Sequence, residues 1–363
     1  MMGDSTGPPA SAQSWEIPEV AADSSFADGV ASRDVKLGGG DGRVWVRLYL
    51  PAAALQINSK RKLPIVVHVH GGGFVRFSAA TSSYHDFCKK VATDATALVV
   101  SLNHRLAPAS CLPAAYQDLV SALHWLRAQA LLSTSDGDGG DAASATVDGN
   151  GDSHDHHHQI TSLRDGGDHH LPQRDPWLAS YADFSSLIFM GGSSGGNIVH
   201  NALLMVLESS KSKRALLPPL SFAAQILLQP FFGGAHRTAS ELRLSDGPIL
   251  TLAMSDQLWS LALPDGASRD HPFCDPLAAA QPLPCNLPPA LVIVGGRDLL
   301  HDRQVAYADF LRESGVEVKL VEYPDATHGF VTPDGTVSYV FMPEVLQFIR
   351  SSAIAPRASP ALT

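Results

Sequence analysis

Residues 186–206 constrain the fold of this chain more than any other stretch. An apolar run opens the stretch, a cluster of four glycines and two serines follows at 191–196, and an apolar run with helical spacing closes it. The first run is short enough for a buried strand, so the stretch predicts a strand, a tight turn and a helix. Strand-to-helix connections of this kind are typical of α/β proteins.

The glycine cluster matches the Gly-x-Ser-x-Gly pattern of a nucleophile elbow over residues 192–196, with Ser194 at its centre. In such a turn the serine stands on strained backbone, and side chains two residues away on either side would collide. The N-terminus of the following helix lies beneath the serine, where backbone N–H groups face developing negative charge. A glycine-rich turn with a purely structural role has the same composition. The choice between a nucleophile elbow and such a turn therefore depends on motifs elsewhere in the chain.

A second glycine run lies upstream, at the end of an apolar segment that predicts a strand over 63–70. The sequence His-Gly-Gly-Gly at 70–73 follows this strand directly. In α/β hydrolases a strand followed by such a run supplies half of the oxyanion hole. Glycines let backbone N–H groups approach a substrate oxygen closely. We therefore predict Gly72, Gly73 and Gly195 as the oxyanion-hole donors.

Two polar residues downstream follow predicted strands. Asp298 comes after an apolar segment at 290–295, and His328 comes after a predicted strand at 317–323. The carboxyl ends of parallel strands build the sites of α/β sheets, and the order Ser, Asp, His is that of α/β hydrolases. Each residue alone also fits a structural role, a helix cap or a turn. Jointly they predict a catalytic triad of Ser194, Asp298 and His328.

The remaining pattern predicts an α/β domain over residues 31–354. A glycine-rich turn at 38–42 and alternating apolar residues at 43–50 predict an opening antiparallel hairpin. Segment 240–275 combines helical spacing with proline turns and predicts helices that cap a site. Further strands are predicted at 97–102 and 222–229, and helices at 114–130, 303–313 and 336–352.

Three segments fall outside this domain pattern. Residues 1–30 are predicted to be a polar lid or tail with apolar anchors, and residues 355–363 a second tail. The anchors are Trp15, Ile17, Val20 and Phe26. Residues 133–170 hold eight Asp, six His and one Arg and almost no apolar residue, which predicts a disordered surface insertion. Part of it begins like a calcium loop, but Ser153 and Gln159 stand where that loop needs Gly and Glu. No metal site is predicted.

Composition narrows the class of protein. A length of 363 residues with 45% hydrophobic content can bury a large core, and the formal net charge of −10 argues against nucleic acid or an anionic membrane as partner. Neither a signal-peptide pattern nor an apolar run of membrane-span length is present. The four cysteines lack metal-ligand spacing and are expected to be reduced. These features predict a cytoplasmic protein, with the nucleus as an alternative location.

Together these motifs resemble those of the plant class I carboxylesterases, relatives of the hormone-sensitive-lipase group and of the gibberellin receptor. The resemblance implies an α/β-hydrolase fold with a mostly parallel eight-stranded sheet flanked by helices, and an N-terminal segment folded over the pocket. It implies a serine carboxylesterase that hydrolyses small esters or lactones through an acyl-enzyme at Ser194, without a cofactor. The motifs that carry it lie at 70–74, 105–108, 112–116, 192–196, 269–272, 298 and 327–330.

The sequence departs from the family pattern in four places. With Ser194 as nucleophile, Ser193 stands where the family usually has Asp. His104 stands where Tyr is usual, and residues 109–111 (Ala-Ser-Cys) replace a Glu and basic residues. The insertion is the fourth departure. None of them removes a group of the predicted triad.

Two other functions remain compatible with this family. One is a hormone receptor, but the receptor relatives carry an aliphatic residue in place of the catalytic His and a Ser in place of the third oxyanion glycine. This chain keeps His328 and Gly73. The other is a dehydratase acting on a hydroxyisoflavanone-like substrate, a reaction that some relatives perform with the same triad. Those relatives tend to have Thr within the His-Gly-Gly-Gly stretch, which favours an esterase here.

Overall fold

A computed structural model describes residues 17–37, 42–57, 61–134, 173–209, 217–278, 283–284, 286–330 and 337–354. Most of the 133–170 insertion, the first half of the N-terminal segment and the C-terminal tail lie outside these residues. The predictions for those segments are therefore not tested by the structure.

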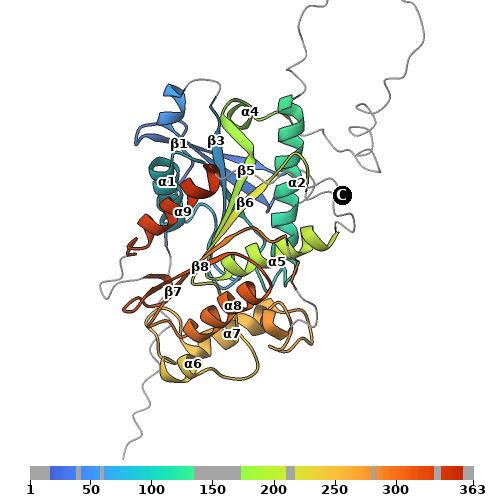
Figure 1. Cartoon of the computed structure of the whole chain (residues 1–363), viewed down its shortest axis with the longest axis vertical. Coiled ribbons are helices and arrows are strands. Elements are labelled where there is room, and N and C mark those ends of the chain that lie inside the picture. The colour runs from blue at the N-terminus through green and yellow to red at the C-terminus, as the bar shows by residue number, and fades with distance from the viewer. Residues whose placement is uncertain are drawn as a thin grey trace, which may run out of the picture.

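Eight strands form one twisted sheet in the order β1-β2-β4-β3-β5-β6-β7-β8 (Figure 1). The pairs β1–β2 and β2–β4 are antiparallel and all the other pairs are parallel. The predicted mostly parallel, eight-stranded α/β architecture is confirmed. The strands are β1 (Val30–Lys36), β2 (Trp45–Pro51), β3 (Leu63–Val69), β4 (Leu98–Asn103), β5 (Ala182–Gly192), β6 (Phe222–Leu228), β7 (Ala290–Gly295) and β8 (Val318–Tyr323).

Helices cover both faces of the sheet because alternate residues of each central strand point to opposite faces. In β3, Ile65 and Val67 join one buried cluster and Val66 joins the other. The first cluster packs under α2 (Ala114–Thr134), α5 (Ser194–Ser209) and α8 (His301–Glu313), and the second under α1 (Ser82–Ala95) and α9 (Met342–Ile354) (Figure 1).

Shorter helices complete the described part of the chain. In α4 (Pro176–Tyr181) the Asp175 carboxylate caps the N-terminus by accepting from the backbone N–H groups of Trp177 and Leu178. Helices α6 (Ala239–Arg243) and α7 (Leu252–Ala262) lie beyond the carboxyl ends of the strands, as expected for the 240–275 segment (Figure 1). Three short 3₁₀ helices are η1 (Ala52–Gln56), η2 (Pro276–Ala278) and η3 (His328–Phe330).

Two details differ from the sequence expectation. The alternation in residues 43–50 places the apolar side chains on one face of the predicted strand, yet Arg47 and Tyr49 on the other face are also buried. Helix α1, which the sequence reasoning missed, covers that face, and His85 Nδ1 lies 3.2 Å from Tyr49 Oη. Arg47 forms an ion pair with Asp34 at 2.6 Å, which offsets its loss of water.

No helix in the described residues combines the length and the apolar character needed to cross a membrane. Of the four cysteines, the three in described positions (Cys88, Cys111 and Cys274) are free thiols. The carboxyl ends of β3, β5, β6, β7 and β8 point toward the same end of the sheet, so the loops that follow them meet there (Figure 1).

Candidate active site

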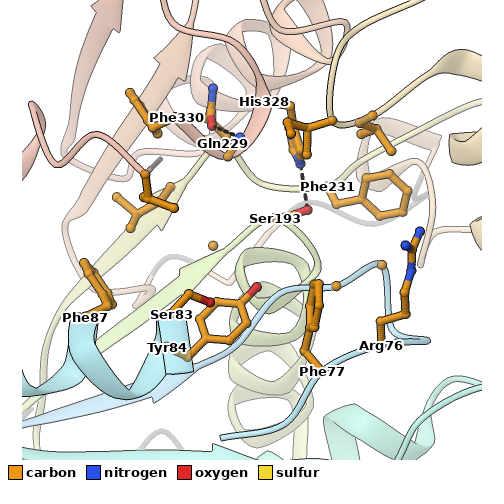
Figure 2. Close-up of a pocket in the computed structure, with 18 of the residues that line it drawn as sticks. Arg76, Phe77, Ser83, Tyr84, Phe87, Ser193, Gln229, Phe231, His328 and Phe330 are labelled. Atoms are coloured by element: carbon orange, nitrogen blue, oxygen red, sulfur yellow. Dashed lines mark hydrogen bonds between the residues drawn. The ribbon is translucent and has the colours of Figure 1, made fainter. Parts of the chain in front are cut away.

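Ser193 occupies the turn between β5 and α5 and faces His328. Its Oγ lies 2.9 Å from His328 Nε2 (Figure 2). Its backbone φ is +52°, a left-handed conformation that a residue with a side chain adopts only where the surrounding structure enforces it. This strained strand-to-helix turn is the geometry of a nucleophile elbow.

Ser194, the predicted nucleophile, does not hold this position; the structure places Ser193 against His328 instead. It is the first residue of α5 and is completely buried. Its Oγ has no hydrogen-bond partner among the described residues. The predicted elbow is therefore displaced by one residue.

The glycines explain why the elbow centres on Ser193. The five-residue pattern also matches residues 191–195, and there both flanking glycines are sterically required. A Cβ on Gly191 would overlap the backbone of Gly195, and a Cβ on Gly195 would overlap the carbonyl oxygen of Val69. A Cβ on Gly192, by contrast, would have its nearest neighbour, Leu228 O, at 3.9 Å. Because 191 and 195 must be glycine and 192 need not be, the elbow pattern fits the register in which Ser193 is the central residue.

The structure brings His328 and Asp298 together, at the ends of neighbouring strands. His328 Nδ1 lies 2.8 Å from Asp298 Oδ2, so the ring donates to the carboxylate there and Nε2 faces Ser193. Asp298 is fully buried. It also accepts hydrogen bonds from the Leu300 N–H at 2.9 Å and from Gln304 Nε2 at 3.0 Å. These donors satisfy the buried carboxylate and fix its orientation.

Gln229, which follows β6, is a site residue that sequence reasoning missed. Its Nε2 donates to the carbonyl of Thr327 at 2.9 Å, and its Oε1 accepts the N–H of Gly329 at 2.7 Å (Figure 2). The amide thus binds the backbone on both sides of His328. Its own φ of +45° is again left-handed. No motif marks this residue, because its partners are backbone groups about a hundred residues away.

The predicted oxyanion-hole glycines separate into two groups. Gly72 (φ +107°) and Gly73 (φ +63°) line the pocket together with Ser193, in backbone conformations that favour glycine. Gly195 is not among the residues that line the pocket, and its Cα packs against the backbone of β3. The residue after Ser193 is Ser194, whose N–H at the first position of α5 has no acceptor within the helix. The third candidate donor for an oxyanion hole is therefore the Ser194 N–H and not the predicted Gly195 N–H.

Two stacked histidines pack beside the glycine loop at 71–73. The rings of His70 and His104 lie 4.2 Å apart at an angle of 12°. Burial lowers the pKa of His104, and burial with the neighbouring His104 lowers the pKa of His70 well below its usual value. Both rings are therefore neutral near pH 7. His70 Nδ1 donates to the carbonyl of Gly71 at 2.8 Å, at the start of the loop.

A pocket of about 250 Å³ extends to both sides of Ser193 (Figure 2). One side is aromatic, because the rings of Phe87, Phe330 and Phe341 all line it, with the last two 4.6 Å apart. Arg76, Phe77 and Phe231 lie on the other side of Ser193 (Figure 2). The pocket is also lined by Ile17 of the N-terminal segment and by four apolar residues in and before α7, namely Ile249, Leu250, Met254 and Leu258.

Of the N-terminal anchors, the structure places Ile17 at this pocket and packs Phe26 against the core; Trp15 lies outside the described residues. The Val20 N–H donates to the carbonyl of Ala80 at 2.8 Å, which ties the segment to the start of α1. Within the described parts of the chain no group of three or more His, Cys, Asp or Glu could hold a metal ion.

The model of a family with the α/β-hydrolase fold matches residues 66–332, a range that contains Ser193, Asp298 and His328. The chain belongs to the α/β-hydrolase family. It is 34% identical over 304 residues to a 3-O-acetylpapaveroxine carboxylesterase of Papaver somniferum, covering 82% of this chain and 83% of that one. It is likewise 34% identical over 311 residues to the probable carboxylesterase 8 of Arabidopsis thaliana, covering 85% and 81%.

This α/β hydrolase is also related to a hormone receptor. It is 33% identical over 293 residues to the gibberellin receptor GID1 of Oryza sativa subsp. japonica, covering 80% of this chain and 67% of that one. A solved structure of a bacterial heroin esterase aligns with a TM-score of 0.65 at 23% identity, over 90% of this chain and 86% of that one. The resemblance to plant carboxylesterases is confirmed, and this α/β hydrolase is a carboxylic ester hydrolase.

The one-residue correction also changes how the elbow departs from the family pattern. With Ser193 at the centre of the elbow, the residue before it is Gly192, so a glycine stands where the family usually has Asp. His104, the second departure, is accounted for by its stacking on His70.

Proposed function

We propose that Ser193 is the nucleophile, His328 the general base and Asp298 the residue that orients His328. The carrying observation is the unbroken hydrogen-bond chain from Ser193 Oγ through both nitrogens of His328 to Asp298. His328 Nε2 takes the proton as Oγ attacks the ester carbonyl, and the Asp298 carboxylate stabilises the imidazolium that forms.

The oxyanion of the tetrahedral intermediate accepts hydrogen bonds from the backbone N–H groups of Gly72, Gly73 and Ser194. Each such donor contributes about 3 kcal/mol to stabilisation of the transition state in serine hydrolases. His328 then gives its proton to the leaving alcohol oxygen, and an acyl-enzyme remains on Ser193. Water, deprotonated by His328, attacks the acyl carbon, and Ser193 leaves with its proton restored. These steps need no cofactor.

The substrate we propose is a small carboxylic ester or lactone of the specialised-metabolite or hormone-like class. The pocket volume of about 250 Å³ supports a small acyl and a small alcohol group. The relative named for an acetyl ester of an alkaloid supports the same size class. Location in the cytoplasm or the nucleus is part of this proposal.

A hormone receptor and a dehydratase remain the alternatives. The retained Ser193–His328 hydrogen bond and the glycine at position 73 favour hydrolysis over simple ligand binding. A receptor would bind its ligand reversibly, would turn over no activated ester and would not become labelled at Ser193. A dehydratase would release water from its substrate without an acyl-enzyme.

Neighbouring serines allow a sharp test of this proposal. A fluorophosphonate probe, with the modified peptide located by mass spectrometry, is expected to label Ser193 in the native protein. Ser193→Ala should abolish labelling and lower kcat for para-nitrophenyl acetate by several orders of magnitude. Ser194→Ala keeps the backbone N–H and removes only a buried hydroxyl that lacks a partner, so labelling should persist. Labelling at residue 194 would overturn the proposal. It would also be overturned if the native protein bound a hormone tightly but was not labelled by the probe.

A further inference from the structure

One charged side chain lines the otherwise uncharged pocket. Among the described lining residues, Arg76 is the only one with a permanent charge; the others are apolar, aromatic, glycine, hydroxyl, amide or imidazole residues. The positive charge is thus placed in a site where nothing in the described lining neutralises it.

Arg76 belongs to the glycine loop that begins at residue 70. Its backbone N–H donates to the carbonyl of Gly72 at 3.1 Å, so the residue is held close to the proposed oxyanion hole. The side chain is half-buried. In Figure 2 it lies across Ser193 from Phe87, at the end of the pocket opposite the aromatic side.

Other arginines in this region of the fold have acidic partners. Arg237 and Arg269 both bind the Asp256 carboxylate, and Arg303 Nε lies 3.1 Å from Glu241 Oε1. Arg76 forms no ion pair with any residue in the part of the chain that the structure describes. A partly desolvated guanidinium without a carboxylate is left with unused donors, which an anionic ligand can satisfy.

We propose that the preferred substrates are esters in which one half carries a carboxylate, and that Arg76 binds this carboxylate. The inference rests on the proposed hydrolysis at Ser193 and names the substrate class of that site. The uncharged half of the ester then faces Phe87, Phe330 and Phe341, where apolar and aromatic groups pack favourably.

The chemistry of the guanidinium favours a carboxylate in particular. Its planar N–H fork matches the two carboxylate oxygens, and such paired hydrogen bonds are about twice as strong as neutral ones. Apolar neighbours such as Leu250 and Met254 exclude water and strengthen the attraction. Because the protein as a whole carries a formal charge of −10, attraction of an anion at this point must come from the local group.

The test uses two matched pairs of esters, one for each side of the scissile bond. The first pair is mono-para-nitrophenyl glutarate and para-nitrophenyl hexanoate. The second is 4-acetoxybenzoate and its methyl ester. In the native protein we expect kcat/KM, corrected for intrinsic reactivity, to favour the anionic member of at least one pair about tenfold or more. In Arg76→Met this ratio should fall at least about tenfold, mainly through KM, which is the loss expected for one charged hydrogen bond.

Two further variants complete the design. Arg76→Lys retains the charge but not the planar fork, so its ratio should lie between those of the native protein and Arg76→Met. Arg312→Met removes an exposed arginine that is paired with Asp309 far from the pocket lining, and it should leave the ratio unchanged. Equal kcat/KM for both members of both pairs in the native protein would overturn the inference. An equal loss for charged and neutral esters in Arg76→Met would also overturn it, by assigning Arg76 to loop structure. Labelling of Ser193 reports separately on the proposed function.

Discussion

The side chain of Gln229 holds His328 through the backbone on both sides of the imidazole, by donating to Thr327 O and accepting from Gly329 N. His328 is therefore positioned from two directions, because Asp298 binds its ring and Gln229 binds its chain. A 3₁₀ turn of three residues that contains a left-handed glycine has little rigidity of its own. The two hydrogen bonds of Gln229, here called the Gln229 clamp, supply the rigidity that the turn lacks.

Replacement of Gln229 by Leu should lower kcat by about tenfold to a hundredfold with a smaller change in KM, because small displacements of a base cost rate. Gln229→Glu keeps the acceptor for Gly329 and loses the donor to Thr327, so its kcat should be intermediate. Gln225→Leu is the matched control. Gln225 lies on β6, the strand that Gln229 follows, and it binds Pro288 O at 3.0 Å, remote from His328. If Gln225→Leu and Gln229→Leu lose kcat equally, the clamp has no special role.

The steric argument for the elbow predicts opposite results at neighbouring glycines. Gly192→Asp should fold and keep hydrolysis within about tenfold of the native rate, since a Cβ there has free space. Gly195→Ala should lose soluble protein or nearly all activity, since its Cβ would overlap the carbonyl of Val69. The measurements are thermal unfolding and turnover of para-nitrophenyl acetate. A well-folded, active Gly195→Ala enzyme would contradict the assigned register.

Buried neutral histidines predict lower stability in acid. Burial lowers the pKa of His68 and of His200 to about 3, and it also lowers the pKa values of His70 and His104. Because the unfolded chain binds these protons near pH 6.5 and the folded one does not, their stabilisation is complete above about 6.5. It is lost progressively as the pH falls toward the folded-state values. Each such histidine contributes a slope of up to about 1.4 kcal/mol per pH unit.

His104→Tyr isolates one of these histidines and introduces the residue that is usual in the family. The variant should show a free energy of unfolding that falls less steeply between pH 6.5 and 5, by up to about 1.4 kcal/mol per pH unit. Denaturant unfolding at several pH values measures this slope. An unchanged slope would mean that His104 is protonated in the folded protein despite its burial.

The N-terminal segment should contribute to substrate binding more than to stability. Deleting residues 1–18 removes Ile17 from the pocket but keeps Asp28, which pairs with Lys89 at 2.9 Å. We expect a higher KM for small esters, or a changed acyl-length preference, with a shift in Tm of only a few degrees. Identical kinetics would make the segment a tail.

Replacement of residues 135–172 by a short Gly/Ser linker is the matched control for that deletion. The insertion leaves α2 and returns before α4, which leads directly into the amino end of β5 (Figure 1). Ser193 follows the carboxyl end of the same strand. Gln129 already joins the two ends of the gap, by donating to Gln173 O and accepting from the Asp175 N–H. Turnover and Tm should therefore stay close to the native values. A collapse of either would assign the insertion a packing or binding role.

The sequence by itself determined the α/β fold class, and its resemblance to plant carboxylesterases implied the mostly parallel eight-stranded sheet. It also singled out Asp298 and His328, which the structure brings within hydrogen-bond distance. Apolar runs and glycine clusters record strands and tight turns directly, because burial and backbone freedom act on each residue locally. Helix α1 and the burial of both faces of β2 were missed, since they depend on which helix covers which face.

Only the tertiary structure decided which serine is exposed. The run Gly-Gly-Ser-Ser-Gly-Gly satisfies the elbow pattern twice, and a local pattern cannot choose between registers one residue apart. The choice is made by the carbonyl oxygen of Val69, on a different strand, which leaves no room for a Cβ at Gly195. Gln229 likewise acquires its position from a chain segment distant in sequence. Excluded volume and hydrogen bonding between such segments exist only once the sheet has formed.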